Sequence, residues 1–98
     1  MLMEIHQVEG FDPQRRSFNR NAEVHRSDQG LFGRFHYEGL RIETGTHFEI
    51  HLVMADLVDR LQALGFTQLR SRVNFKGSRY LAERHPWLRS SSRRQDEP

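Results

Sequence analysis

Residues 50–66, IHLVMADLVDRLQALGF, decide the fold, because they carry the longest helical pattern in the chain. Their apolar side chains recur every three or four positions, at Ile50, Met54, Leu57, Leu61 and Leu64. This spacing is typical of an amphipathic helix that packs one face on a core. Gly65 and Phe66 then match the end of a Schellman motif, in which a glycine adopts a left-handed conformation and the next apolar residue packs back on the helix. The sequence therefore predicts one main helix that ends at residue 64.

The start of this helix can be placed in two ways. Thr46, followed three residues later by Glu49, matches a capping box, which predicts a helix over residues 47–64. Alternatively, the alternation of apolar residues over 48–52 is typical of a strand, and the helix then begins near residue 54. Because no glycine or proline separates the two halves, we predict the longer helix.

The segment after the helix has the pattern of a half-buried strand. Residues 68–76, QLRSRVNFK, alternate between mainly apolar and polar residues, and the cations lie on the polar side. The Lys-Gly pair at 76–77 predicts a hairpin turn, after which residues 78–82 return as a second strand. The alternative is a short helix that Pro86 ends. We predict the hairpin.

The first half of the chain has the pattern of short strands joined by turns. Strand patterns occur at residues 3–8, 22–27 and 31–37. The polar residues 14–21 predict a loop, and Gly39 interrupts the third strand pattern as either a bulge or a turn. The fold class that we predict is α+β, a small and mostly antiparallel sheet with the helix of residues 47–64 packed on one face.

The length of 98 residues fits one domain. We expect residues 1–88 to form a single globular domain, with Trp87 and Leu88 closing the edge of its core. Residues 89–98 contain no apolar side chain, so we expect them to be a disordered basic and polar tail.

The net charge of +2 hides an uneven distribution along the chain. Residues 1–65 carry seven Arg and ten Asp or Glu, which gives −3. Residues 66–94 carry seven Arg, one Lys and one Glu, which gives +7, and the two acids of the tail contribute −2. The last third is therefore strongly basic beside a mildly acidic body.

The composition excludes several classes of function. The chain has no Cys, which excludes disulfides, cysteine zinc sites and thiol catalysis. No run approaches the ~20 apolar residues of a membrane-spanning helix, and no glycine-rich phosphate loop occurs. We expect a cytoplasmic, non-enzymatic protein without a cofactor and without contact with a membrane.

The cations of the last third form the first candidate site. Arg70, Arg72 and Lys76 share the polar side of the predicted strand. Further candidates follow at Arg79, Tyr80 and Arg84. Such a layout suits a phosphate backbone, and an aromatic ring beside arginines can stack on an unpaired base. We predict that this face binds an anionic partner, with RNA or DNA as the first candidate. The alternative explanation is the ordinary polar side of an amphipathic strand.

Residues 57–86 resemble the opening helix and hairpin of the HicA-type mRNA interferases. Gly65-Phe66, Arg70 and Gly77-Ser78 match that family's order of Gly-Phe, Arg and Gly-Ser-His, with extra residues before Gly77. The resemblance implies a fold like that of double-stranded-RNA-binding domains in this part, and RNA as a ligand. Arg79 stands where that family has its catalytic His, so the resemblance does not imply a ribonuclease.

Two histidines form the second candidate site. His47 and His51 are four residues apart, so they lie on one side of either a helix or a strand. Two imidazoles and a nearby carboxylate can hold Zn²⁺ or another divalent metal. The alternative is a pair of partly exposed histidines that bind nothing.

A third hypothesis is a module for protein–protein contact, including a homodimer. The acidic body and the basic strand are complementary in charge, so the arginine face of one copy can meet the acidic side of another. An aromatic-rich strand at residues 31–37 adds a further surface for such contact.

Overall fold

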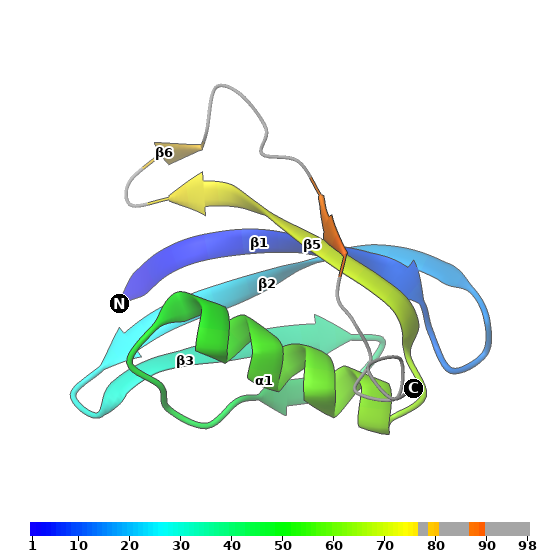
Figure 1. The fold of residues 1–98 in the computed structure, drawn as a ribbon, viewed down its shortest axis with the longest axis horizontal. Coiled ribbons are helices and arrows are strands. Elements are labelled where there is room, and N and C mark those ends of the chain that lie inside the picture. The colour runs from blue at the N-terminus through cyan, green and yellow to red at the C-terminus, as the bar shows by residue number, and fades with distance from the viewer. Residues whose placement is uncertain (77–78, 81–86, 90–98) are drawn as a thin grey trace, which may run out of the picture.

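The computed structural model describes residues 1–76, 79–80 and 87–89, without the side chains of residues 75, 76, 79, 80 and 89. Its strands form one antiparallel sheet in the order β4-β3-β2-β1-β5-β6, and β7 also pairs with β5. The helix α1 lies over one face of this sheet, next to β3 and β4 (Figure 1). The predicted α+β fold, an antiparallel sheet with one helix on one face, is confirmed.

The elements have the following bounds: β1 Leu2–Phe11, β2 Ser17–Ser27, β3 Gly30–Tyr37, β4 Leu40–Glu43, α1 Ile50–Ala63, β5 Thr67–Lys76, β6 Arg79–Tyr80 and β7 Leu88–Arg89. The strands predicted in the first half lie within β1, β2 and β3. The loop predicted over residues 14–21 is wrong from Ser17 onward, because β2 begins there and pairs with the end of β1. Backbone pairing with a neighbouring strand outweighs the local polarity of this segment.

The interruption at Gly39 is a turn. Tyr37 pairs with Leu40, so Glu38 and Gly39 form a two-residue hairpin between β3 and β4. Both turn residues have positive φ, 46° and 85°, as the tight turns that suit the twist of a hairpin require. The turn sets the register that places Phe35 opposite Ile42 in the core.

The predicted end of the helix is confirmed. The Phe66 N–H donates to the Leu61 carbonyl over 3.0 Å, and the Gly65 N–H donates to the Gln62 carbonyl over 3.0 Å. Gly65 has φ +101°, and Phe66 is buried. These are the bonds and the left-handed glycine of a Schellman motif.

The predicted start of the helix at residue 47 is wrong, and so is a strand through residue 52. α1 begins at Ile50 with Glu49 as its N-cap, and no side chain caps it. His47 instead exchanges two backbone hydrogen bonds of 2.8 Å with Leu31 at the start of β3. This bridge keeps the chain extended at His47, so the helix starts only after it.

A bulge in β5 decides which of its residues face the core. A Cβ on Gly10 of β1 would lie 2.7 Å from the carbonyl oxygen of Thr67, so β1 approaches β5 too closely for any other residue. Beside it, Gln68 has φ +51°, and the β1–β5 register shifts. After the bulge Leu69 is buried and Arg70 is exposed.

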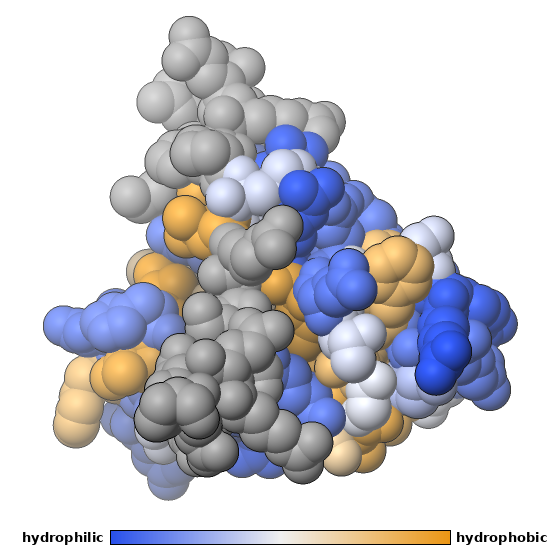
Figure 2. Space-filling model, turned by 45° about the vertical axis from the view of Figure 1, so that its right-hand side comes forward, coloured by the Kyte–Doolittle hydropathy of each residue, from blue (hydrophilic) through white to orange (hydrophobic). Residues whose placement is uncertain are grey.

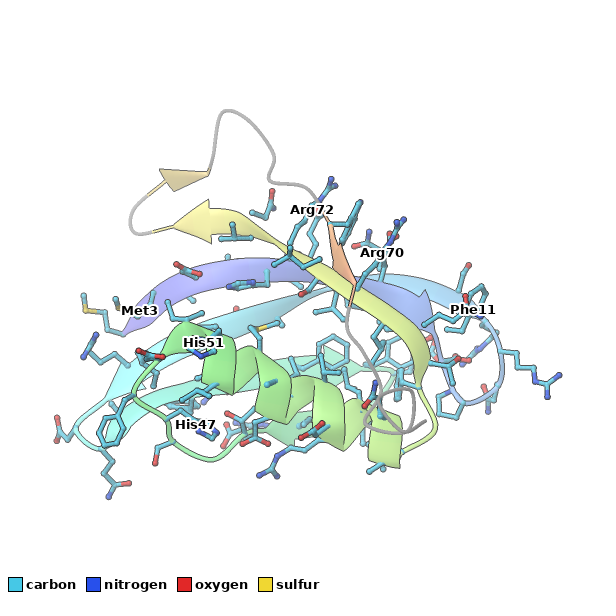
Figure 3. The ribbon with its side chains drawn as sticks, viewed as in Figure 1. Met3, Phe11, His47, His51, Arg70 and Arg72 are labelled. Atoms are coloured by element: carbon cyan, nitrogen blue, oxygen red, sulfur yellow. The ribbon has the colours of Figure 1, made fainter. Side chains whose placement is uncertain are left out.

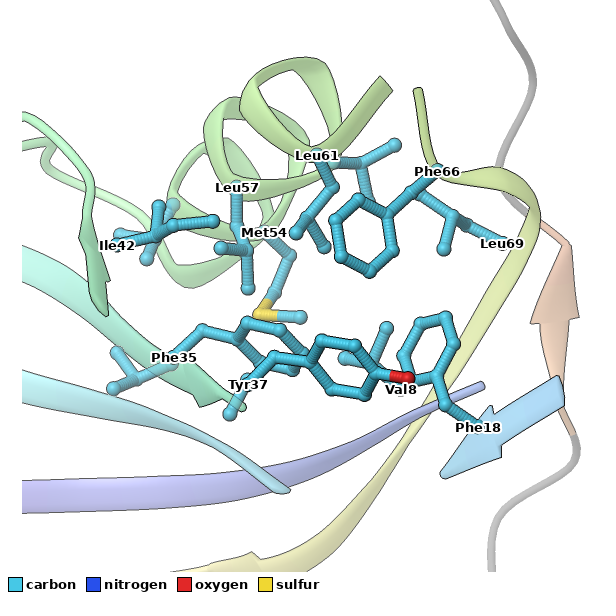
Figure 4. Packing of buried hydrophobic residues seen from close by; sticks show 14 of the residues in the cluster. Val8, Phe18, Phe35, Tyr37, Ile42, Met54, Leu57, Leu61, Phe66 and Leu69 are labelled. Atoms are coloured by element: carbon cyan, nitrogen blue, oxygen red, sulfur yellow. The ribbon is translucent and has the colours of Figure 1, made fainter. Parts of the chain in front are cut away.

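The core lies between α1 and the sheet. It consists of residues Val8, Phe18, Ala22, Val24, Leu31, Phe35, Tyr37, Ile42, Val53, Met54, Leu57, Val58, Leu61, Phe66 and Leu69. Phe18, Tyr37 and Phe66 meet edge to face, with ring centroids 5.2–5.5 Å apart (Figure 4). Within the described residues no helix is long and apolar enough to cross a membrane.

A buried carboxylate ties the first hairpin to the core. Asp12 accepts hydrogen bonds from the Tyr37 hydroxyl (2.8 Å), the Arg16 side chain (2.8 Å) and the backbone N–H groups of Gln14 and Arg16 (2.9 Å each). Burial acts to raise the pKa of Asp12, but the hydrogen bonds to its charged form outweigh burial and lower the pKa to about 2.

A second polar pair lies on the core side of β1. His6 Nε2 is 2.8 Å from Glu4 Oε1, and both side chains are largely buried. Burial lowers the pKa of His6, and the neighbouring Glu4 opposes this shift. The pair lies opposite Val24 and Ala22 of β2, beside the core residues rather than on the open face.

Candidate nucleic-acid interface

Arg70 and Arg72 project from β5 on the side away from α1 (Figure 3). The ring of Trp87, just before β7, lies against both guanidinium groups. The guanidinium carbons of Arg70 and Arg72 are 4.9 Å and 4.1 Å from the ring centroid. Cations at these distances are attracted to the face of the ring. The prediction that Trp87 and Leu88 close the core is wrong, because Trp87 packs on the outer arginines and Leu88 is exposed.

Both arginines also bind side chains of the neighbouring strand β1. Arg70 forms an ion pair with Glu9, and Arg72 Nε donates to Gln7 Oε1 over 2.8 Å. The register explains these contacts, because Arg70 lies opposite Glu9 and Arg72 lies opposite Gln7. The acidic body of the chain thus compensates part of the basic strand.

The structure separates the remaining predicted residues from this pair. A second register shift lies between Val73 and Phe75, and beyond it Lys76 pairs with Glu4 of β1. Lys76 was predicted to lie on the same side of the strand as Arg70 and Arg72, because residues two apart in a strand face the same way. The register shift interrupts this alternation, so the basis of that prediction does not hold for Lys76. The backbones of Arg79 and Tyr80 form β6, opposite Lys76 and Phe75, so a strand returns along β5 as predicted. The turn predicted at 76–77 is wrong at Lys76, which belongs to β5, and residues 77, 78, 81 and 82 lie outside the described residues. Arg84 lies outside the described residues.

A second aromatic cluster lies on the outer side of β2 and β3. The rings of His25 and Phe32 stack with centroids 5.5 Å apart and 19° between their planes. The Arg34 guanidinium lies 5.7 Å from the Phe32 ring centroid. His25 also bonds to Glu23 over 2.9 Å, and Arg34 donates to Glu43 over 2.9 Å.

Sequence reasoning did not select Trp87, Phe32 or Arg34 as site residues. The signal for Phe32 and Arg34 was present, since they occupy the even positions of residues 31–37 while the buried residues occupy the odd ones. For Trp87 no local signal existed, because its place depends on β7 pairing with β5 across the sheet.

The outer face carries charges of both signs. Among its described side chains are the cations Arg34, Arg41, Arg70 and Arg72 and the anions Glu9, Glu23 and Glu43. Figure 2, turned by 45° from Figure 1, views the molecule mainly from the side of α1, and there the coloured hydrophobic residues form separate areas bordered by hydrophilic ones. Trp87 between two guanidinium groups, rather than an excess of positive charge, distinguishes this face, since a single guanidinium, that of Arg20, also lies 5.2 Å from the ring centroid of Tyr37 on the other face.

The two histidines do not form a joint site. His47 Nε2 is 2.8 Å from Asp56 of α1, whereas His51 contacts Glu49 over 3.3 Å and is exposed. His47 precedes the helix, so the two side chains do not share a helical face as expected. Across the part of the chain that the structure describes, no group of three or more His, Asp or Glu is arranged to hold a metal ion.

Asp56 gives His47 a structural role. Its carboxylate accepts from His47, from the Arg60 side chain over 2.6 Å and from the Gly45 N–H over 3.0 Å. Burial acts to raise the pKa of Asp56, but these hydrogen bonds outweigh it and lower the pKa. The group ties the β4–α1 connection to the helix.

No protein-family model, curated protein or solved structure matches the chain. Gly77 and Ser78, which carried part of the resemblance to the HicA-type interferases, lie outside the described residues. The strands of that stretch are β5 and β6. These elements belong to a sheet in which four strands come earlier in the chain.

Proposed function

We propose that this chain is a small binding domain whose outer sheet face binds single-stranded nucleic acid, RNA or DNA. The observation that supports this is the contact of Trp87 with two guanidinium groups at 4.1 Å and 4.9 Å. A ring flanked by cations on a sheet face can stack on an unpaired base while the cations bond to the adjoining phosphates.

The two arginines differ in what a phosphate must displace. Arg72 bonds to the neutral Gln7, so a phosphate can take this place without removing a negative charge. Arg70 pairs with Glu9, and a phosphate would have to compete with that carboxylate. We therefore expect Arg72 to contribute most to binding and the salt dependence to be shallow, with a log–log slope of about −0.7 for each phosphate contact.

Fluorescence of Trp87 tests the proposal directly, because it is the only Trp in the chain. Single-stranded oligonucleotides should quench its emission on binding, and duplexes of equal length should bind much more weakly. Anisotropy of a dye-labelled oligonucleotide gives an independent affinity. We expect Arg72→Ala to weaken binding about 10-fold, in line with the loss of a stacking and phosphate contact.

Two further variants make the test specific. Glu9→Gln releases Arg70 from its ion pair, so it should tighten binding a few-fold. Arg60→Ala is the control, because Arg60 has a similar side-chain exposure (49% against 44% for Arg70) but lies on α1, across the sheet from the proposed site. Absence of binding to single strands, equal binding of duplexes, or an Arg72→Ala variant that binds like the unmodified protein would contradict the proposal.

A further inference from the structure

We infer that the bound single strand crosses the sheet from Trp87 to the cluster of His25, Phe32 and Arg34, so that the face has two stacking subsites. This inference rests on the proposed function and adds the path and the length of the ligand. The observation behind it is a second contact between a cation and a ring on the outer face, in which the Arg34 guanidinium lies 5.7 Å from the centroid of the Phe32 ring.

The register of the strands gives the separation of the two subsites. Arg72 of β5 lies opposite Gln7 of β1, and Gln7 in turn lies opposite Asn21 of β2. Phe32 of β3 lies opposite His25, which is also on β2. Four residues along β2 correspond to about 13 Å, and three strand spacings from β5 to β3 correspond to about 14 Å. The subsites are therefore on the order of 20 Å apart along the diagonal.

The surface between the subsites suits a strand of nucleic acid. Gln7 and the exposed Asn21 lie between them on β1 and β2, and both carry neutral amides that can bond to bases or phosphates. Glu23 bonds to His25 beside the second subsite, so a phosphate has to bind away from this carboxylate. Twist turns the face by roughly 60–75° over three strand spacings. A flexible single strand can follow this turn, whereas a stiff duplex cannot.

The separation predicts a minimum ligand length. A stacked strand advances about 3.4 Å per nucleotide, so about six nucleotides span 20 Å, and an extended strand needs fewer. Oligonucleotides of about three nucleotides should reach one subsite, while those of about six or more should reach both. We expect affinity to rise at least 10-fold between these lengths and to change little beyond about eight nucleotides.

The experiment is a length series of oligothymidylates, followed by the fluorescence of Trp87. Phe32→Ala should remove the rise in affinity with length and leave the binding of the shortest oligonucleotides unchanged. Phe48→Ala is the matched control, because Phe48 is 92% exposed and lies two residues before the start of α1, outside the strands that form the outer face.

The outcomes separate this inference from the proposed function. Quenching by short and long oligonucleotides with equal affinity, or a Phe32→Ala variant that keeps the full rise, overturns the second subsite and leaves the proposed function standing. Absence of quenching at every length overturns both. A rise that Phe48→Ala also removes places the second contact at the helix and overturns the path across the sheet.

Discussion

The two faces of the sheet hold aromatic rings in opposite surroundings. Under α1 the rings of Phe18, Tyr37 and Phe66 pack edge to face with one another, and only the Tyr37 ring also has a guanidinium nearby, that of Arg20 at 5.2 Å, among the described residues. On the outer face Phe32 and Trp87 lie against guanidinium groups. The strand β3 contributes to both faces, since Phe35 is 1% exposed and Phe32 is only partly buried.

The difference shows that position in the alternation, rather than residue type, decides what an aromatic ring does. A ring in the core is surrounded by apolar atoms, and its removal leaves a cavity. A ring on the outer face is only partly buried and interacts with cations through its face. The first kind stabilises the fold, and the proposed function rests on the second.

Truncation of the two phenylalanines of β3 should have the largest effect and the clearest contrast. We expect Phe35→Ala to lower the free energy of unfolding by about 3–5 kcal/mol, because it leaves a cavity beneath α1. Phe32→Ala should lower it by about 1 kcal/mol or less. Urea denaturation measures both values. Equal losses for the two variants would show that the outer ring is part of the core.

A substitution at Gly10 should disturb the bulge that sets the facing of Leu69 and Arg70. A Cβ there would meet the carbonyl oxygens of Thr67 and Gln68 at 2.7 Å and 3.0 Å. We expect Gly10→Ala to cost about 1–3 kcal/mol of stability, since backbone atoms must move apart. Thermal and urea unfolding measure the loss.

Gly45→Ala is the control for this substitution. The nearest atom to its Cβ would be Asp56 Oδ2 at 3.6 Å, an ordinary contact. We expect a change within about 0.5 kcal/mol. If Gly10→Ala were equally mild, the close approach of β1 to β5 would not be what fixes the bulge.

The pH dependence of stability should show the contributions of Asp12 and His6 in two different pH ranges. The pKa of Asp12 is about 2 in the folded chain, below the ordinary value of 3.8. Its hydrogen bonds therefore stabilise the fold above pH 4, and this contribution is lost as the pH falls from about 4 to about 2. Asp12→Asn should reduce the decline in this window, as measured by urea midpoints at successive pH values, and the remaining decline belongs to carboxylates such as Asp56 and Glu43, whose pKa values are also lowered.

His6 should act in a different window. Its pKa is lowered from 6.5, because burial disfavours the charged ring. Protonation of the unfolded chain then begins near pH 6.5, and stability falls from there downward. A decline near pH 6.5 that persists in Asp12→Asn and disappears in His6→Gln would assign the two windows. A single decline that Asp12→Asn abolishes entirely would contradict the assignment.

The parts of the fold that local patterns determine were predictable from the sequence. The apolar stripe of α1 and the Gly65-Phe66 ending both follow from residues close in the chain. The start of α1 was not, because His47 is held by Leu31, sixteen residues earlier. The strand at 17–21 was missed for the same reason, since its polar residues are ordered by pairing with β1.

The candidate site was predictable only in part, for a related reason. Simple alternation along β5 correctly predicts that Arg70 and Arg72 lie on the same face. The bulge after Val73 changes the facing of later residues, so alternation does not place Lys76 on that face. The compensation of Arg70 by Glu9 and the contact with Trp87 depend on pairing between distant segments. Charge along the chain therefore indicated where cations are concentrated, and the pairing of the strands decided which side chains these cations contact.

The smallest effect that we predict concerns the contact between Arg72 and Trp87. A double-mutant cycle with Arg72→Ala, Trp87→Ala and the double variant should give a coupling energy of about 0.5–1 kcal/mol in urea unfolding. The same cycle for Arg70 and Trp87 should give less, because Arg70 lies farther from the ring, at 4.9 Å against 4.1 Å, and is shared with Glu9. Since cation–ring attraction is modest at exposed sites, removing Trp87 should reduce stability far less than removing Phe35. Coupling of zero in both cycles would leave the ring and the cations as independent neighbours, and the contrast between the two faces would then rest on Phe32 alone.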